Sequence, residues 1–300
     1  MNGFVLLSAL CGGIGTYWIL RGRTIREHET ESLHQTVHVE RRGQVRYLRF
    51  DSRGWQGAMH LREPERLLFA YQQAFLLAVC VVPNLRTFLA IGVGTGTALG
   101  TMRRLFPTAQ LHGVDIDGEV IRVAREYFHA PDDERIEYLA ADGRRYLEDA
   151  TAEFDLVFLD AYADDRIPPR LETIEFVRLL RSRLAEGGAV AVNVIGAVRG
   201  RESLYLRRVW RTYRDVFAHV VIIPTTPFPG EPQNMLLIAA DAPLPDRQAL
   251  WQRVSGSTHF NRHKRRLNRL AGRMLHDPPW DLAEVKPLTD EDMLLFRLRD

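Results

Sequence analysis

The sequence predicts an α/β fold: a doubly wound, mostly parallel sheet with an antiparallel C-terminal hairpin, preceded by a small antiparallel β domain. The first observation is an alternation of apolar runs and helical segments, which is typical of a parallel sheet. The runs cover residues 87–91, 111–116, 136–140, 154–160 and 189–195. The second observation is that no crossover helix fits between two further runs, 220–224 and 234–240, so they should pair antiparallel.

Composition places the chain among globular proteins and excludes several classes of function. Of its 300 residues, 46% are hydrophobic and 26% are charged, which is enough to form a sizeable core. The formal net charge is only +2, which argues against a general nucleic-acid binder. The two cysteines, Cys11 and Cys80, form neither a disulfide framework nor a CxxC motif. We therefore expect no metal and a reducing compartment.

Composition and periodicity divide the chain into four parts. An apolar N-terminal segment covers residues 1–23, and a small β-hairpin and helix domain covers residues 36–83. A Rossmann-like transferase domain follows at 84–242, and a helical, basic extension ends the chain at 243–300.

Residues 4–20 of the first part carry no charge and are followed by Arg21, Arg23 and Arg26. This is the pattern of a short membrane segment whose C-terminal flank is cytoplasmic. Its length lies at the lower end of the range for a spanning helix, about 17–25 residues. The alternative is an apolar helix that docks on the protein itself. Both interpretations leave the rest of the chain in the cytoplasm, in the first case tethered to the inner face of the cell membrane.

The second part combines a hairpin with a helix. Two β-rich runs, 37–39 and 45–50, flank the turn signal Arg42-Gly43 and predict the hairpin. Residues 65–82 then show apolar positions at helical spacing, and Pro83-Asn84 ends the helix. We expect this sheet and helix to form a small lid before the main domain.

The segment AIGVGTGT predicts a nucleoside site. Gly92, Gly94 and Gly96 lie between an apolar strand and a helix, where glycine lets the backbone turn sharply and approach a ligand. Asp115 ends the next strand, where a carboxylate can accept both ribose hydroxyls of an adenosine. Asp142 ends the third strand and is a candidate to bind the adenine amino group, with helix capping as the alternative. With the antiparallel final hairpin, this pattern is typical of S-adenosylmethionine-dependent, methyltransferase-like enzymes.

The candidate reactive group is Asp160, which ends the fourth strand and so lies in the crevice where open α/β sheets bind ligands. A carboxylate there can hold an acceptor amine and take its proton. The following loop, 161–173, is rich in acids and prolines, and we expect it to cover the pocket. Tyr162 is a candidate for orienting the acceptor, with packing in the loop as the alternative. Asp164 is a candidate substrate contact, with simple solvation as the alternative.

From about residue 37 to residue 240 the sequence resembles the spermidine synthase (polyamine aminopropyltransferase) family. The matching motifs are RYLRFD with Gln56, YQQ at 71–73, AIGVGTGT, VDIDGEVIRVAREYF, Asp142-Gly143, and LVFLDAY followed by IP and LET. The resemblance implies a small β domain joined to a methyltransferase-like domain that binds decarboxylated S-adenosylmethionine. The implied cofactor contacts are Gln56, Asp115 and Asp142, together with Gly92, Gly94, Gly96 and Gly143. Asp160 is the implied catalytic acid, and we expect Tyr71, Tyr162 and Asp164 to bind the substrate.

Several positions depart from the family's motifs. The family's GGGDG reads GVGTG at residues 92–96, which removes an acid. Its YQE ends in Gln73, and a histidine further along that helix is Leu77. Its DSSDP loop is residues 160–164, which keep the first acid and move the second by one residue. Because polyamines are polycations, the loss of carboxylates from their binding track should cost affinity.

The motifs and their departures from the family are consistent with three functions. The first is a spermidine synthase-like aminopropyltransferase, which moves an aminopropyl group from decarboxylated S-adenosylmethionine to an amine such as putrescine. The second is an S-adenosylmethionine-dependent methyltransferase with an unknown small-molecule acceptor, which would explain the missing carboxylates. The third is a non-catalytic, membrane-tethered nucleoside-binding protein that uses residues 4–20 and the basic run 262–273 against anionic lipid. We also expect a homodimer and no nucleic-acid partner.

Overall fold

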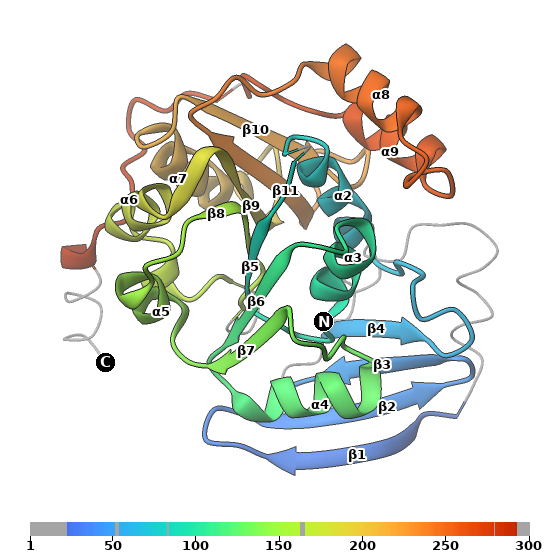
Figure 1. Cartoon of the computed structure of the whole chain (residues 1–300). Helices are drawn as coiled ribbons and strands as arrows, with labels where there is room; N and C mark the ends of the chain where they lie inside the picture. The colour runs from blue at the N-terminus through green and yellow to red at the C-terminus, as the bar shows by residue number, and fades with distance from the viewer. Residues whose placement is uncertain (1–22, 52–53, 83, 163–165, 279, 293–300) are drawn as a thin grey trace.

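The structure is a computed structural model that describes residues 23–51, 54–82, 84–162, 166–278 and 280–292. The apolar segment 4–20 and Asp164 lie outside the described residues. Two sheets dominate the described part, a small antiparallel sheet and a larger mixed sheet (Figure 1).

The small sheet consists of β1 (Ile25–Glu31), β2 (Thr36–Arg42), β3 (Val45–Arg49) and β4 (Trp55–His60). Neighbouring strands pair antiparallel in the order β1-β2-β3-β4. The predicted hairpin is confirmed as β2 and β3, whose turn places Gly43 at φ 57°. The prediction did not include β1, because its sequence IREHETE has no fully buried residue and therefore no apolar alternation.

This sheet packs on a helix of the main domain, α4 (Gly118–Phe128), as Figure 1 shows. The shared apolar cluster contains Val37, Val39, Leu48, Met59, Val120, Val123 and Phe128. A polar contact reinforces it, because the Ser32 hydroxyl donates a 2.6 Å hydrogen bond to the buried carboxylate of Asp117, the N-cap of α4. The small sheet is therefore fixed beside the loop that follows Asp115.

The large sheet has the strand order β10-β11-β9-β8-β5-β6-β7. Its strands are β5 (Thr87–Ile91), β6 (Gln110–Asp115), β7 (Ile136–Ala140), β8 (Phe154–Leu159), β9 (Leu184–Gly196), β10 (His219–Pro224) and β11 (Gln233–Ala240). Strands β5 to β9 are parallel, whereas β11 runs antiparallel to both β9 and β10. The predicted fold class, a mostly parallel sheet with an antiparallel C-terminal hairpin, is confirmed.

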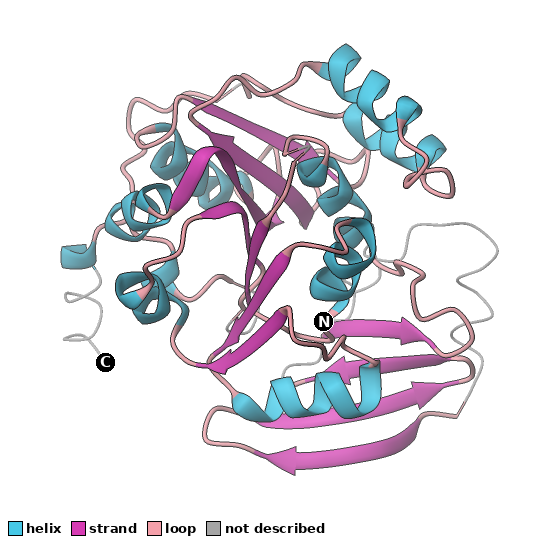
Figure 2. Cartoon of the chain, viewed as in Figure 1, coloured by secondary structure: helices cyan, strands magenta, loops and turns pink. Residues whose placement is uncertain are grey.

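Helices cover both faces of the large sheet (Figure 2). One face carries α2 (Ala70–Val79), α3 (Thr97–Leu105), α8 (Arg247–Gly256) and α9 (Lys264–Ala271). The other face carries α5 (Gly143–Asp149), α6 (Ile174–Ser182) and α7 (Ser203–Arg214), with the short 3-10 helix η2 (Pro169–Leu171) before α6. The basic run of the C-terminal extension forms α9, whose Leu267 and Leu270 are buried.

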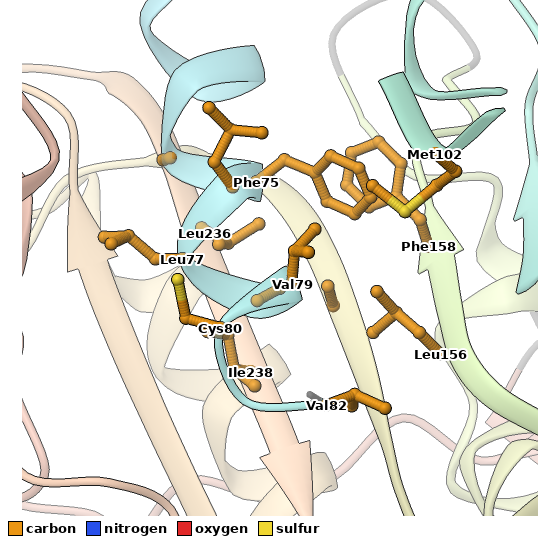
Figure 3. Packing of buried hydrophobic residues seen from close by; sticks show 14 of the residues in the cluster. Phe75, Leu77, Val79, Cys80, Val82, Met102, Leu156, Phe158, Leu236 and Ile238 are labelled. Atoms are coloured by element: carbon orange, nitrogen blue, oxygen red, sulfur yellow. The ribbon is translucent and has the colours of Figure 1, made fainter. Parts of the chain in front are cut away.

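Helix α2 differs from the prediction in its start and in its packing. The expected helix began at residue 65, but α2 begins at Ala70, because the Gln72 side chain accepts the Phe69 N–H (3.1 Å) and caps the helix there. The helix packs against β9, β11 and α9. Phe75 stacks on Phe158 of β8 with ring centroids 4.2 Å apart (Figure 3). It therefore belongs with the large sheet, whereas the sequence analysis grouped it with the small one.

Candidate active site

The glycine loop after β5 forms the floor of the candidate site. Gly92, Gly94 and Gly96 all have positive φ values, 92°, 53° and 72°, a region that residues with a Cβ rarely adopt. A Cβ on Gly92 would lie 2.4 Å from the carbonyl oxygen of Asp160. Glycine at this position therefore lets the loops after β5 and β8 come into contact.

Asp115 at the end of β6 holds the glycine loop in place. Its Oδ2 accepts a 2.9 Å hydrogen bond from the Val93 N–H, and its Oδ1 accepts one of 3.1 Å from the Asp117 N–H. Burial raises the pKa of this carboxyl, while the two backbone N–H donors oppose the shift. The side chain of the next residue, Ile116, is 53% exposed. An exposed apolar side chain beside a strand-end carboxylate provides a surface on which a planar base can rest.

Asp142 and Gly143 lie at the end of β7, at the start of α5. The Asp142 Oδ1 accepts the backbone N–H groups of Arg144 and Arg145, each at 3.0 Å, so the capping role that the sequence left open is confirmed. Its Oδ2 lies 3.4 Å from the guanidinium of Arg170. A Cβ on Gly143 would lie 2.5 Å from Cγ2 of Ile91, which explains the glycine by close packing between α5 and β5.

Strand β4 brings Gln56 to the same loop. Its neighbour Gly57 packs so closely on buried Thr95 that a Cβ there would lie 2.4 Å from the threonine Cγ2. The small sheet thus contributes a wall of the site next to the glycine loop. The glycine loop thus contacts Asp115 through Val93 on one side and the strand that carries Gln56 through Thr95 on the other.

Asp160 follows β8, and two neighbours orient its carboxylate. The Asn193 Nδ2 of β9 donates a 2.8 Å hydrogen bond to Oδ1, and the Tyr71 hydroxyl of α2 donates a second bond. Asn234 donates to the Asn193 Oδ1 (3.2 Å), which fixes the amide with its N–H toward Asp160. Burial raises the pKa of Asp160 to about 7 against the opposing effect of both hydrogen bonds. Such a group can release and accept a proton at neutral pH.

Two tyrosines share this part of the site. The Tyr162 hydroxyl donates a 2.6 Å hydrogen bond to the Asn193 carbonyl oxygen. Burial raises the pKa of both Tyr71 and Tyr162 well above the usual value, and the nearby Asp160 adds to the effect. Both hydroxyls are therefore neutral. The expected partners Asp160, Tyr71 and Tyr162 come together from α2 and the loop after β8.

The departures from the family's motifs also have a structural meaning. Gln73, which replaces a glutamate, is tied to its own helix entry, because its Nε2 donates a 2.7 Å hydrogen bond to the Leu67 carbonyl oxygen. Leu77, at the position of the histidine, is fully buried in the core. Neither side chain supplies a charge for a polyamine.

Sequence reasoning missed Asn193, Ile116 and Glu172. Asn193 is a single polar residue in the apolar run AVAVNVI, and that interruption was a usable signal. Glu172 follows η2, where burial raises its pKa to about 7 and the Tyr205 hydroxyl donates to it. In the ranges that the structure describes, no group of three or more His, Cys, Asp or Glu side chains is placed to hold a metal.

Comparisons with known proteins point in one direction. A model of the spermine/spermidine synthase domain matches residues 68–244. A polyamine aminopropyltransferase from Vibrio vulnificus is 27% identical over 262 residues, which is 85% of this chain and 84% of that protein. A probable polyamine aminopropyl transferase from Bifidobacterium longum is 33% identical over 134 residues, which is 45% of this chain and 30% of that protein.

Solved structures show the same fold. A probable spermidine synthase from Corynebacterium glutamicum superposes with a TM-score of 0.67 at 19% identity, covering 77% of this chain and 88% of that one. Human methyltransferase-like protein 13, solved with SAH, superposes with a TM-score of 0.51 at 20% identity, covering 75% of this chain and 99% of that one. At these identities the likeness concerns the fold.

Proposed function

The chain belongs to the spermine/spermidine synthase family, whose domain model covers more than half of it, and on this premise we propose that it is a polyamine aminopropyltransferase. The donor is decarboxylated S-adenosylmethionine, and the acceptor is an aliphatic amine, with putrescine as the first candidate. The observation that carries the proposal is Asp160, a carboxylate with a pKa raised to about 7 and oriented by Asn193 and Tyr71.

The residues around the glycine loop fit the adenosine part of the donor. Asp115 is half-buried, so its carboxylate can accept the ribose hydroxyls while it holds the loop. Ile116 offers an apolar surface to the adenine ring. Asp142 uses Oδ1 as a helix cap, and its Oδ2, which lies 3.4 Å from the Arg170 guanidinium, has a further lone pair for the adenine amino group. Gln56 and the positive-φ glycines complete the donor site.

Asp160 provides the proton transfer in this proposal. The acceptor must attack through a nitrogen lone pair, so the Asp160 carboxylate takes the proton that an ammonium group would otherwise keep. The new bond forms between this nitrogen and the carbon next to the sulfonium, and the C–S bond breaks with its electrons on sulfur. The leaving thioether is neutral, so the site needs no acid for it.

Tyr71 and Tyr162 orient the acceptor. The hydroxyl proton of Tyr162 is used in the bond to the Asn193 carbonyl, so its oxygen is left to accept an N–H from the amine. Tyr71 donates to Asp160 and holds that carboxylate in one rotamer. Alignment of the two reactants then supplies much of the rate enhancement.

Titration calorimetry with the two donors tests this proposal. Decarboxylated S-adenosylmethionine should bind at least about tenfold more tightly than S-adenosylmethionine, because the extra carboxylate of the latter would approach Asp160, a like charge. S-adenosylmethionine that binds equally well or better would favour methyl transfer instead.

The cellular setting is part of the same proposal. We place the protein in the cytoplasm as a homodimer, and light scattering in solution tests the second point. Among the described helices none is long and apolar enough to cross a membrane. Contact with the inner face of the membrane through residues 4–20 stays a prediction, which vesicle flotation of the full chain can test.

A further inference from the structure

The C-terminal extension contacts the edge of the large sheet beside the loop between β10 and β11. Leu275 forms an antiparallel bridge with Ile222 of the outer strand β10: its N–H donates to the Ile222 carbonyl oxygen (2.8 Å), and its carbonyl oxygen accepts the Ile222 N–H (3.0 Å). Two residues earlier, the Arg273 guanidinium donates a hydrogen bond to the Thr225 carbonyl oxygen. Arg273 and Leu275 lie beyond residue 244, where the matched family domain ends.

Thr225 connects this contact to β11. The ladder between β10 and β11 ends at the pair of Pro224 and Met235, where proline has no N–H to donate. The Thr225 hydroxyl, which belongs to a buried residue, donates a 2.6 Å hydrogen bond to the Asn234 carbonyl oxygen. The extension therefore holds the residue that in turn holds the backbone of Asn234.

Asn234 reaches the candidate site through Asn193. On β9, Asn193 lies opposite Leu236 of β11, so Asn234, two residues before Leu236, points to the same face of the sheet. The Asn234 Nδ2 donates to the Asn193 Oδ1 (3.2 Å), and the Asn193 Nδ2 donates to the Asp160 Oδ1 (2.8 Å). A carboxamide has donors at one end and an acceptor at the other, so it can take two opposite orientations. The Asn234 N–H selects the one that presents a donor to Asp160.

We propose that the C-terminal extension positions the carboxylate of Asp160, with Arg273 and Asn234 as positioning residues. Arg273 holds Thr225, and Thr225 holds Asn234. Asn234 then holds the Asn193 amide with its donor toward Asp160. The two orientations of this amide are the discrete states through which a distant residue can act. The inference rests on the proposed aminopropyl transfer, in which Asp160 is the base.

Asn234→Leu removes the donor to Asn193 and adds no charge. The Asn193 amide is then free to present its oxygen to Asp160, where it accepts a hydrogen bond only from the protonated carboxyl. The pKa of Asp160 should therefore rise by about one unit, the scale of one hydrogen bond to a charged group. Among the described residues, the ionisable side chains that act on Asp160 are Tyr71 and Tyr162, whose hydroxyls stay neutral. A shift thus reports the amide.

Urea unfolding follows this titration without requiring turnover. The free energy of unfolding is measured against pH with and without Asp160→Asn, and the pH at which the difference levels off marks the pKa of the carboxyl in the folded protein. This pH should be about 7 in the wild type and about one unit higher in Asn234→Leu. In the Asn193→Ala background, Asn234→Leu should move it no further. An unmoved pH in the single variant, or the same shift in the Asn193→Ala background, overturns the inference.

Arg273→Leu tests the part played by the extension, and Arg269→Leu, at an exposed arginine of α9, is the matched control. Arg273→Leu should raise the pKa of Asp160 and lower kcat about two- to fivefold at neutral pH, with the loss recovered at alkaline pH. Its affinity for methylthioadenosine should stay within about twofold of wild type. Arg269→Leu should change none of these quantities. No loss of kcat in Arg273→Leu, or a loss that persists at alkaline pH, overturns the role of the extension.

The same measurements separate this inference from the proposed function. A wild-type protein that makes no spermidine, while Asn234→Leu still shifts the titration of Asp160, contradicts the proposed function alone. Spermidine formation by the wild type, with an unmoved titration in Asn234→Leu, contradicts the inference alone.

Discussion

Replacing Asp160 with asparagine should make the protein more stable at alkaline pH and almost inactive. Burial raises the pKa of this carboxyl from the usual 3.8 to about 7, so the folded protein keeps a proton there that the unfolded chain has already released. Wild-type stability therefore falls as pH rises from about 4 to about 7 and stays at the lower level above that. Asparagine carries no charge and removes this dependence.

The structure sets the size of the effect. Each tenfold difference in proton affinity corresponds to about 1.4 kcal/mol, so the charge costs at most about 4 kcal/mol at pH 8. The asparagine keeps the hydrogen bond from Asn193, but it must donate a hydrogen bond to the Tyr71 hydroxyl instead of accepting one. This change reduces the stability gained by the variant by about 1 kcal/mol at every pH. Between pH 5 and pH 8, the free energy of unfolding of Asp160→Asn relative to wild type should therefore rise by about 2–3 kcal/mol.

Urea unfolding at both pH values measures this difference, and turnover is measured on the same preparations. Turnover should fall by about 10²–10⁴-fold, the usual contribution of a general base, while donor affinity changes little. Asp149→Asn, at a carboxylate whose side chain is 78% exposed, is the matched control and should change neither quantity. A relative stability that stays flat with pH would refute the assigned environment of Asp160, and near-normal turnover would refute its role.

Three further substitutions follow from the same contacts. Asp115→Ala should weaken methylthioadenosine binding by roughly 1.5–3 kcal/mol, the scale of hydrogen bonds to a charged group, and unchanged affinity in calorimetry would remove Asp115 from the donor site. Gly92→Ala should lower the free energy of unfolding by about 1–3 kcal/mol, because its Cβ would meet the Asp160 carbonyl at a φ of 92°; a variant with wild-type melting behaviour would contradict this close approach. Asn193→Ala removes a donor that favours the charged form of Asp160, so the pKa of that carboxyl rises and the ascending limb of the pH–rate profile should move to higher pH. An unmoved profile would show that the amide does not act through Asp160.

Local signals predicted much of the fold. The hairpin of β10 and β11 follows from a connection too short for a helix, and the glycine loop follows from three glycines at a strand end. Strand β1 was missed because a half-exposed edge strand carries no apolar alternation. The start of α2 depends on one capping side chain, Gln72, and its placement on the large sheet depends on contacts with distant strands.

The candidate site also contains residues that the sequence predicts and residues that only the folded structure brings together. Asp115 and Asp160 were predicted because a carboxylate at a strand end is visible in the sequence. Asn193 and Glu172 were not predicted, because their side chains hydrogen-bond with Asp160 and Tyr205, each 33 positions away, and because the raised pKa of Glu172 depends on its burial. Such convergence is a property of the folded chain, and sequence spacing does not reveal it.

The central claim is aminopropyl transfer, and a product assay tests it most directly. Wild-type protein is incubated with putrescine and either decarboxylated S-adenosylmethionine or S-adenosylmethionine, and the products are identified by mass spectrometry. We expect equal amounts of spermidine and methylthioadenosine from the decarboxylated donor, and loss of both products with Asp160→Asn. S-adenosylhomocysteine and a methylated amine from the second donor, with no spermidine from the first, would contradict the account.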